Sequence, residues 1–242
     1  MALYLVLGCP ALLLLGAFLL RRWPTPPPAL RRHLPDVYLE GNIGAGKSTL
    51  ATALASTGNY DVYQEPIEEW RGTGGVNFLA ALMNDYAANA YLFQVLVLGT
   101  LCNRMRCARR TSRMRIFERS ARCAVDVFSE HAHAVGAISR MEMVTLRVLR
   151  DATRPAHPVV YLYVRIEPEE ARRRTQRRGR PEESQLPHYF FARLHRRLDD
   201  WLLRAEYSER RNEVVVLDGT LSPEDLLAAA LEALERVCLY AA

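Results

Sequence analysis

Lysine is almost absent from this chain of 242 residues, because 31 of its 32 basic side chains are arginine. Codon bias in a GC-rich genome accounts for the arginines, but it does not explain why Lys47 alone is retained. The net charge of +5 is modest. It suits a small anionic ligand and is too low to indicate nucleic-acid binding.

Paired cysteines are also lacking, since no CxxC pair and no Cys/His cluster at metal-ligand spacing occurs. This pattern excludes a disulfide framework, argues against structural zinc and indicates reduced, intracellular thiols. The five cysteines are Cys9, Cys102, Cys107, Cys123 and Cys238. Half of the residues are apolar, which excludes wholesale disorder, and the length suits one α/β domain with at most an appendage.

Charge is missing from residues 1–20, which are about as long as a membrane-spanning helix, although Pro10 and Gly16 weaken that pattern. A secretory signal would carry positive charge before the apolar run, and a mitochondrial presequence would spread arginines through it. Arg21 and Arg22 instead follow the run. By the positive-inside rule, the rest of the chain then lies on the cytosolic side.

Residues 1–35 are therefore predicted to be an apolar segment with a Pro- and Arg-rich linker, and residues 36–242 a separate domain. We expect this domain at the cytoplasmic face, either in the cytosol or anchored through residues 1–20, with the mitochondrion as the alternative. An apolar tail that never meets a membrane is the other interpretation.

After the linker, short apolar stretches alternate with helical ones. Five stretches rich in β-branched and aromatic residues are predicted strands: residues 36–40, 60–64, 114–117, 159–164 and 214–217. Helices are expected over residues 48–56, 76–110, 120–151 (two helices), from 168 onward, 187–206 and 222–238. Strands separated by helices form parallel sheets covered on both faces, so the sequence predicts an α/β fold with a five-stranded parallel sheet.

A glycine-rich segment follows the first predicted strand and opens a helix. It matches the phosphate-loop pattern G-x-x-x-x-G-K-[ST] at every fixed position and in the required context. The backbone of such a loop binds phosphate oxygens, its lysine reaches the β and γ phosphates, and its hydroxyl binds Mg²⁺. The predicted ATP-binding residues are Gly41, Asn42, Ile43, Gly44, Ala45, Gly46, Lys47, Ser48 and Thr49. We also predict a catalytic role for Lys47 and a metal-ligand role for Ser48.

Charged residues follow the second and third predicted strands. Glu65 comes after the second, and Glu118 and Arg119 end the third. In a doubly wound sheet these ends lie beside the phosphate loop. There, Glu65 would accept the proton of an attacking hydroxyl, Glu118 would join the Mg²⁺ shell and Arg119 would hold the attacking oxygen. A solvated glutamate and an ordinary strand-end ion pair are the alternatives.

Six arginines lie within residues 172–180. Guanidinium groups bind phosphate oxygens bidentately, so this helical run is predicted to be a lid over ATP. A solvated basic face and a nucleic-acid patch are the alternatives. The arginines predicted to bind ATP are Arg174, Arg178 and Arg180.

Four segments, in this order and at this spacing, resemble the deoxyribonucleoside kinase family over about residues 36–218: EGNIGAGKST at 40–49, EPIEEW at 65–70, ERS at 118–120 and RRGRPEES at 177–184. Within the family, the resemblance is to enzymes of the type of mitochondrial thymidine kinase and the insect multisubstrate kinase. The resemblance implies a P-loop kinase fold, a homodimer, and Mg²⁺-dependent transfer of the ATP γ-phosphate to the 5′-hydroxyl of a deoxynucleoside.

The resemblance also implies roles for residues in the catalytic motifs. Glu65 corresponds to the general base, Arg119 to the arginine that contacts the 5′-oxygen, and Glu118 to the acidic residue near the metal. Trp70 corresponds to a wall of the nucleoside pocket.

Other positions are implied to hold the nucleoside and the nucleotide. Gln94 corresponds to the glutamine that pairs with the base edge, and one amide can serve an N–H and a carbonyl together. Phe128 corresponds to the aromatic that stacks on the base, and Glu183 to the carboxylate on the sugar 3′-hydroxyl. The predicted lid arginines correspond to those of the family.

The chain departs from the family pattern inside the nucleoside pocket. Met83 occupies the position of a tyrosine that shares the 3′-hydroxyl, and Tyr86 is a candidate substitute. Ungapped counting places Leu101 and Ala124 where deoxycytidine-preferring members carry an Arg/Asp pair. Apolar groups there leave room for a thymine methyl, so a pyrimidine preference with thymidine first is predicted.

Two other classes of function remain open on sequence alone. A nucleoside monophosphate or small-metabolite kinase would share the loop and the lid, but it would not need the Glu65 and Arg119 motifs. A non-catalytic nucleotide switch or membrane-anchored regulator would have little use for Glu65 or Gln94.

Overall fold

The computed structural model describes residues 34–108, 111–155, 157, 159–183, 186–204 and 213–241. The possible anchor at residues 1–20 and most of the predicted linker lie outside these ranges, so both stay predictions. Among the described helices, none is long and apolar enough to cross a bilayer.

A five-stranded sheet forms the centre of the domain, in the order β2-β3-β1-β4-β5, and all neighbouring strands are parallel. The strands are β1 (Asp36–Glu40), β2 (Tyr60–Tyr63), β3 (Met114–Glu118), β4 (Val159–Arg165) and β5 (Glu213–Asp218). The predicted α/β fold, with its five strands, is confirmed. Because the strands are parallel, the loops after β1, β2 and β3 all leave the same edge of the sheet.

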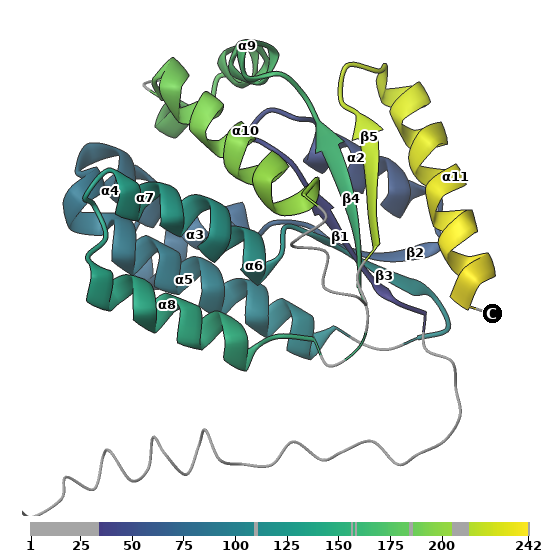
Figure 1. The fold of residues 1–242 in the computed structure, drawn as a ribbon, viewed down its shortest axis with the longest axis horizontal. Helices are drawn as coiled ribbons and strands as arrows, with labels where there is room; N and C mark the ends of the chain where they lie inside the picture. The colour runs from purple at the N-terminus through teal and green to yellow at the C-terminus, as the bar shows by residue number, and fades with distance from the viewer. Residues whose placement is uncertain are drawn as a thin grey trace, which may run out of the picture. The chain divides into compact units, whose positions relative to one another are not determined.

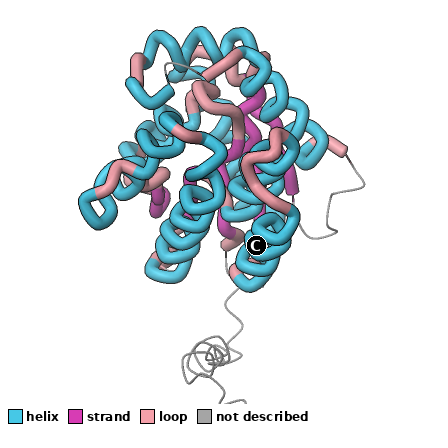
Figure 2. The backbone as a smooth tube through the Cα atoms, turned by 90° about the vertical axis from the view of Figure 1, so that its left-hand side faces the viewer, coloured by secondary structure: helices cyan, strands magenta, loops and turns pink. Residues whose placement is uncertain are grey.

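Helices cover both faces of this sheet (Figure 1), and a view turned by 90° shows the strands enclosed between them (Figure 2). The helices are α2 (Lys47–Ser56), α3 (Ile67–Gly72), α4 (Phe78–Asn84), α5 (Tyr86–Cys107), α6 (Ala121–Cys123), α7 (Glu130–Ala134), α8 (Arg140–Ala152), α9 (Pro168–Arg178), α10 (His188–Leu202) and α11 (Pro223–Ala241). A π-helical turn (Ala124–Ser129) joins α6 to α7, and 3₁₀ turns occupy Thr73–Gly75 and Pro181–Glu183.

Alternating strand residues explain the two covered faces, since successive side chains of a strand point to opposite sides. Leu39 of β1 and Leu162 of β4 pack in one core cluster with residues of α2 and α11. Tyr38 and Tyr161, on the opposite face, pack in another cluster with residues of α10. Helices α3, α4, α5 and α8 form a third cluster of their own.

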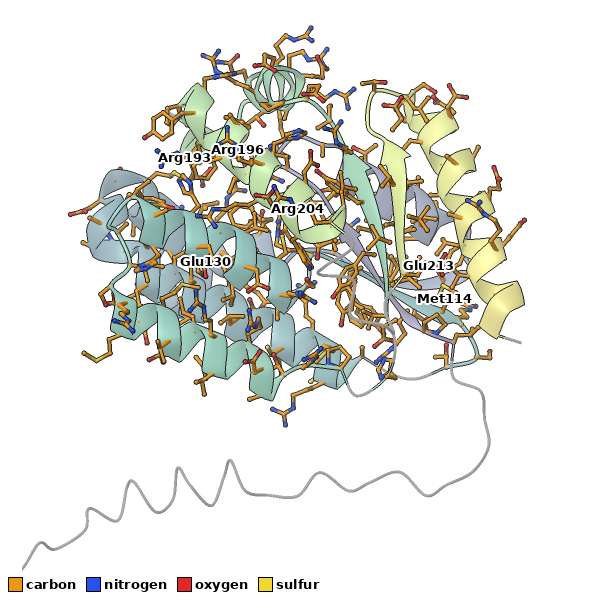
Figure 3. All side chains as sticks on the ribbon, viewed as in Figure 1. Met114, Glu130, Arg193, Arg196, Arg204 and Glu213 are labelled. Atoms are coloured by element: carbon orange, nitrogen blue, oxygen red, sulfur yellow. The ribbon has the colours of Figure 1, made fainter. Side chains whose placement is uncertain are left out.

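Helix α10 is amphipathic and packs against the sheet through its apolar face. Phe191, Leu194 and Leu198 recur at three- to four-residue spacing and are buried. Arg193 and Arg196, on the other side of the helix, are exposed (Figure 3).

The helical region predicted over residues 76–110 is divided into two helices, α4 and α5. Asp85 breaks the run with φ −143° and ψ 92°, and its side chain accepts the N–H of Ala88 as the N-cap of α5. Asn77 caps α4 in the same way. Both are residue types with a strong N-cap preference. The break bends the chain so that α4 and α5 pack against each other.

Candidate active site

A cavity of about 640 Å³ lies at the carboxyl edge of the sheet, between the phosphate loop, α3 to α5 and the arginine-rich α9. It brings together most of the predicted site residues: Ile43, Gly44, Gly46, Lys47, Ser48, Thr49, Glu65, Trp70, Met83, Gln94, Glu118, Arg119, Phe128, Arg174, Arg178, Arg180 and Glu183. The other predicted loop residues, Gly41, Asn42 and Ala45, are buried beneath the cavity and do not line it.

The phosphate loop requires glycine at two close approaches. At Gly41, φ is +151° and a Cβ would lie 2.6 Å from the carbonyl oxygen of Val164. At Gly44, φ is +78° and a Cβ would lie 2.4 Å from the carbonyl oxygen of Ala171. Both contacts are with backbone, which cannot move aside cheaply. The loop is therefore clamped between β4 and α9, and only glycine fits at these points.

Lys47 is 5% exposed and is held inside this loop. Its Nζ donates to the carbonyl oxygens of Gly41 at 3.0 Å and Asn42 at 2.9 Å. Burial and the neighbouring Arg119 lower the pKa of Lys47. The ammonium thus lies at the loop that would bind phosphate.

Glu65 and Arg119 form an ion pair between their carboxylate and guanidinium groups. Burial raises the pKa of Glu65, but the positive charges of Arg119 and Lys47 outweigh burial and hold this pKa below its ordinary value. Glu65 is therefore ionised at neutral pH and can accept a proton. The Arg119 guanidinium also lies 4.4 Å from the centre of the Phe128 ring, within cation–π range.

Arg119 is held by an unusual backbone at the end of β3. Its φ is +66°, the only positive value among the described non-glycine residues. Two hydrogen bonds hold this turn: the Arg119 N–H donates to the Leu39 carbonyl at 3.1 Å, and the Ser120 N–H donates to Glu40 Oε1 at 3.0 Å. Glu40 was not among the predicted site residues, yet its buried carboxyl helps to aim the Arg119 side chain.

Replacing Glu40 by glutamine is expected to weaken the pH dependence of stability. Glu40 is 0% exposed, and burial raises its pKa. The stability that it contributes is therefore present below the ordinary glutamate pKa and is lost as pH rises through the raised, folded-state pKa, at roughly 1.4 kcal/mol per unit of difference. Urea unfolding at several pH values between 4 and 8 measures this. The free energy of unfolding should fall less with rising pH in Glu40→Gln than in the parent.

The control for this experiment is Glu224→Gln, which changes an exposed carboxylate at the start of α11. It should keep the pH profile of the parent. Identical profiles for the parent and Glu40→Gln would contradict a buried, hard-to-ionise carboxyl at this position.

The predicted metal ligands are adjacent. Ser48 Oγ donates to Glu118 Oε1 at 2.6 Å, and Glu118 Oε2 accepts the Glu65 N–H at 3.3 Å. A hydroxyl and a carboxylate are oxygen donors of the kind that Mg²⁺ takes, together with substrate phosphates. The described residues contain no group of three or more His, Cys, Asp or Glu side chains suited to a metal. The Ser48 hydroxyl and the Glu118 carboxylate, at the foot of the phosphate loop, would fit Mg²⁺ bound together with a nucleotide.

The inner part of the cavity, toward α5, is largely apolar with one polar group. Gln94 is 6% exposed and its Oε1 has no hydrogen-bond partner. The Trp70 ring meets Phe93 edge-on at 5.7 Å, and its Nε1 donates to Thr100 Oγ1 at 2.9 Å. A buried amide without a partner in an aromatic-walled cavity is suited to a flat ligand with donor and acceptor atoms.

Met83 and Tyr86 both line the cavity. Burial raises the pKa of Tyr86 to about 12, so its hydroxyl stays protonated. The placement is compatible with the hypothesis that Tyr86 substitutes for the family tyrosine, which stays a prediction.

The predicted lid is linked to the cavity through carboxylates. Arg178 and Arg180 bind Glu183 at 2.5 and 3.3 Å. Arg71 of α3 binds both oxygens of the adjacent Glu182 at 3.0 Å, which joins the lid to the opposite wall. Arg174 instead donates to Glu170 and to the carbonyl of Gly219.

Several cavity residues were missed by sequence reasoning. Phe93 and Val97 share the face of α5 with Gln94, so helical spacing could have found them, whereas Phe190 arrives from α10 without any local signal. Ala124 lines the candidate active site, whereas Leu101, nearly two turns beyond Gln94, lines a second cavity and packs in the same apolar cluster as Ala124. Their correspondence to the family's Arg/Asp pair stays a prediction.

Comparison with known proteins decides the family, because a model of the deoxynucleoside kinases matches residues 37–233. The chain belongs to the deoxynucleoside kinase family. It is 33% identical to a thymidine kinase of Ictalurid herpesvirus 1, over 90% of this chain and 92% of that protein. It is 26% identical to the human mitochondrial thymidine kinase 2, over 86% and 79% of the two chains.

A solved structure shares the fold of this deoxynucleoside kinase. It is the deoxyadenosine kinase of M. mycoides with dCMP and a flexible dCDP bound. The TM-score is 0.70 at 17% identity, over 84% of this chain and 99% of that one. At this identity the match supports the P-loop kinase fold and does not define the substrate.

Proposed function

We propose that the cavity described above is the active site of this deoxynucleoside kinase, and that thymidine is its preferred acceptor. The observation that carries the proposal is the meeting of three groups in one cavity: the loop lysine, the Glu65–Arg119 pair and the Gln94 side chain, whose buried Oε1 has no hydrogen-bond partner. A nucleoside monophosphate kinase or a nucleotide switch does not require the second and third groups together.

In this arrangement Glu65 accepts the proton of the 5′-hydroxyl as that oxygen attacks the γ-phosphate of ATP. Arg119, already paired with Glu65, holds the attacking oxygen. Lys47 binds the β- and γ-phosphate oxygens on which charge develops, which is the main source of catalysis in phosphoryl transfer.

Ser48 and Glu118 would hold Mg²⁺, which supplies positive charge between the β and γ phosphates when bound. The lid arginines Arg174, Arg178 and Arg180 would bind the phosphates from the other side. Their partner Glu183 would bind the sugar 3′-hydroxyl, which would couple acceptor binding to the position of the lid.

The preference for thymidine rests on the walls around Gln94. One amide can donate to a carbonyl and accept from an N–H of a pyrimidine edge. Val97 and Ala124 are small and apolar, so they leave room for a methyl group beside the base. Both of the relatives compared above are named thymidine kinases, which supports this assignment.

A panel of thymidine, deoxycytidine, deoxyadenosine and deoxyguanosine, each with ATP and Mg²⁺, tests the proposal. We expect thymidine to give the highest kcat/KM, at least about tenfold above either purine nucleoside, because a mismatched polar edge leaves buried groups unpaired. A purine nucleoside as the best substrate would overturn the preference. Activity only on nucleoside monophosphates would overturn the assignment of the acceptor.

The same enzyme is proposed to be a homodimer that pairs through α5 and α8. Met141, Val144 and Val148 recur along one face of α8 and are 80%, 49% and 62% exposed. Leu92 and Val95 are exposed on α5, which packs against α8. A row of exposed apolar side chains on adjacent helices is typical of a protein interface.

Val144→Glu is expected to shift the protein from dimer to monomer at micromolar concentration, because a carboxylate would be buried without a partner. Sedimentation velocity measures the change. Arg236→Glu, on the exposed side of α11, is the matched control and should remain dimeric. A parent protein that sediments as a monomer would contradict the dimer, as would a fully dimeric Val144→Glu.

The cytoplasmic location and the membrane contact through residues 1–20 stay predictions. The mitochondrion is the alternative, and the human relative named for that organelle supports it.

A further inference from the structure

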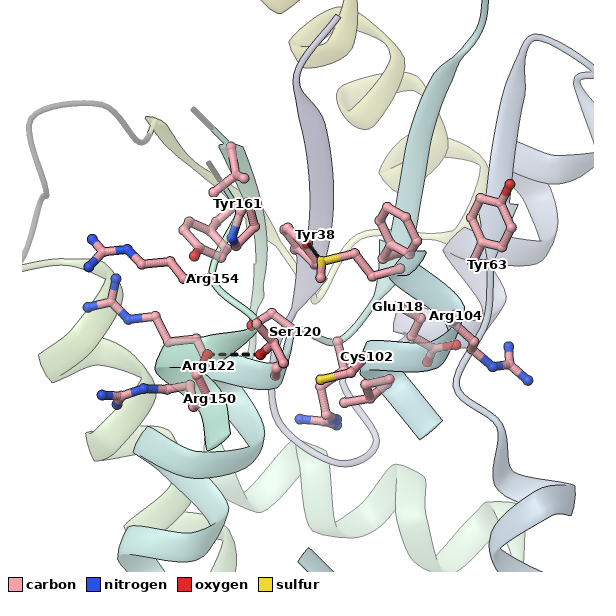
Figure 4. Close-up of a pocket in the computed structure, with 18 of the residues that line it drawn as sticks. Tyr38, Tyr63, Cys102, Arg104, Glu118, Ser120, Arg122, Arg150, Arg154 and Tyr161 are labelled. Atoms are coloured by element: carbon pink, nitrogen blue, oxygen red, sulfur yellow. Dashed lines mark hydrogen bonds between the residues drawn. The ribbon is translucent and has the colours of Figure 1, made fainter. Parts of the chain in front are cut away.

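A second cavity, of about 420 Å³, lies behind the candidate active site, and we call it the rear cavity. It opens between the α10-facing side of the sheet and the ends of α5, α6 and α8 (Figure 4). Apart from Glu118 and Arg119, which line both cavities, the kinase chemistry proposed above uses none of its lining residues.

The floor of the rear cavity is a row of aromatic rings on adjacent strands. Tyr38 lies between Phe117 and Tyr161, with ring centres 5.5 and 5.9 Å apart. All three are at most 5% exposed. The Tyr38 hydroxyl donates to the Met105 sulfur at 3.5 Å, a weak acceptor for a buried hydroxyl. A ligand ring could contact the exposed edges of these rings, and a ligand oxygen would be a better acceptor than the thioether.

Guanidinium groups gather on one side of the rear cavity. Figure 4 shows Arg122, Arg150 and Arg154 extending in the same direction below and beside Tyr161. Arg122 and Arg150 share the carboxylate of Asp126. Five arginines and three carboxylates line the cavity, and two of the five, Arg104 and Arg119, are paired with Glu69 and Glu65, which lie outside its lining. The other three guanidinium groups can donate hydrogen bonds to an anionic group.

The rear cavity and the candidate active site share a wall. Glu118 and Arg119 line both cavities. This is the segment in which Arg119 has a positive φ and the Ser120 N–H is bound by Glu40. A molecule that presses on this segment from the rear cavity would move the Arg119 guanidinium relative to Glu65.

We propose that the rear cavity is a second ligand site, which binds a planar aromatic anion and lowers turnover through the shared wall. The ring lies against the edges of Tyr38 and Tyr161, and the negative group lies among the arginines of α6 and α8. Neither a ring without charge nor an anion without a ring fulfils both conditions.

Calorimetry with 1-naphthyl phosphate tests this, with 1-naphthol and inorganic phosphate as the two half-ligands. The best deoxynucleoside substrate, a non-hydrolysable ATP analogue and Mg²⁺ are present at saturation, so that the active site is filled. We expect 1-naphthyl phosphate to bind at least tenfold more tightly than either half-ligand. In the kinase assay it should lower kcat at saturating substrates by at least twofold.

Two variants test whether 1-naphthyl phosphate binds in the rear cavity. Arg154→Glu reverses a charge at the exposed rim, and Thr153→Trp fills the mouth without changing charge. Each variant should weaken 1-naphthyl phosphate binding at least tenfold and abolish the inhibition. Its urea unfolding midpoint and its basal kcat should stay at the values of the parent. Arg236→Glu, remote from both cavities, is the matched control.

Displacement of 1-naphthyl phosphate by the active-site ligands would overturn the proposal, because binding would then belong to the known cavity. Unchanged affinity in both Arg154→Glu and Thr153→Trp would overturn it as well. Binding that leaves kcat unaltered would overturn the coupling through Glu118 and Arg119. The assignment of the kinase itself would stand in each case, because basal turnover is measured independently.

Discussion

Glu65→Gln should lower kcat for deoxynucleoside phosphorylation by about 10²- to 10⁴-fold while leaving ATP binding close to that of the parent. The amide keeps the size of the side chain but cannot accept the proton of the 5′-hydroxyl. Glu65 is ionised through the neutral range because Arg119 and Lys47 hold its pKa down, so the loss should persist between pH 6 and 8. Steady-state kinetics and calorimetry with ATP and Mg²⁺ measure the two quantities separately.

The matched control is Glu68→Gln, a nearby carboxylate whose side chain is 84% exposed. It should keep kcat within about twofold, because surface ion pairs contribute little. If Glu65→Gln retained half of the parental kcat, the proton acceptor would lie elsewhere. If it lost ATP binding to the same extent as turnover, Glu65 would act on the nucleotide, and a binding protein would become the better description.

Lys47→Arg, although it preserves charge, should lower kcat/KM for ATP by about 10²-fold or more. Lys47 binds two loop carbonyls from within a buried turn. A planar guanidinium is wider than an ammonium and carries its donors in a fixed fork, so it cannot occupy this space and reach phosphate oxygens. A loss of this size is typical when one hydrogen-bond donor to the charge that develops in the transition state is removed.

Lys47→Met gives the reference value for complete removal of the charge. The kcat/KM of Lys47→Arg should be closer to that of Lys47→Met than to that of the parent, although Arg and Lys carry the same charge. Arg236→Lys, an exposed position on α11, should match the parent. A kcat/KM for Lys47→Arg within threefold of the parent would show that charge alone suffices in the loop.

The elements that sequence predicts well are those in which local pattern and tertiary environment agree. Strand β4 is an unbroken run of β-branched and aromatic residues, and it forms a strand that pairs on both sides. The phosphate loop has fixed spacing because backbone approaches at Gly41 and Gly44 permit no side chain. Residues tied to such motifs, including Glu65 and Arg119, could therefore be expected beside the loop, and both line its cavity.

Sequence-based prediction fails where packing between distant segments of the chain determines the local structure. The break at Asp85 depends on a capping hydrogen bond that overrides the helical pattern on either side. Glu40 precedes the fixed positions of the phosphate loop and Phe190 belongs to a segment without a chemical motif, and only the fold brings them beside Arg119 and the cavity. The proposed roles in the site await the variants above.

The burial of the lone lysine has a practical consequence for studying this fold. A protease specific for lysine has one cleavage site in the entire chain, after Lys47, and the folded loop shields it between β4 and α9. Cleavage after Lys47 therefore requires the phosphate loop to detach from β4 and α9. The rate at which fragments 1–47 and 48–242 form would report the opening of this one loop, without any label, and nucleotide bound there would slow it.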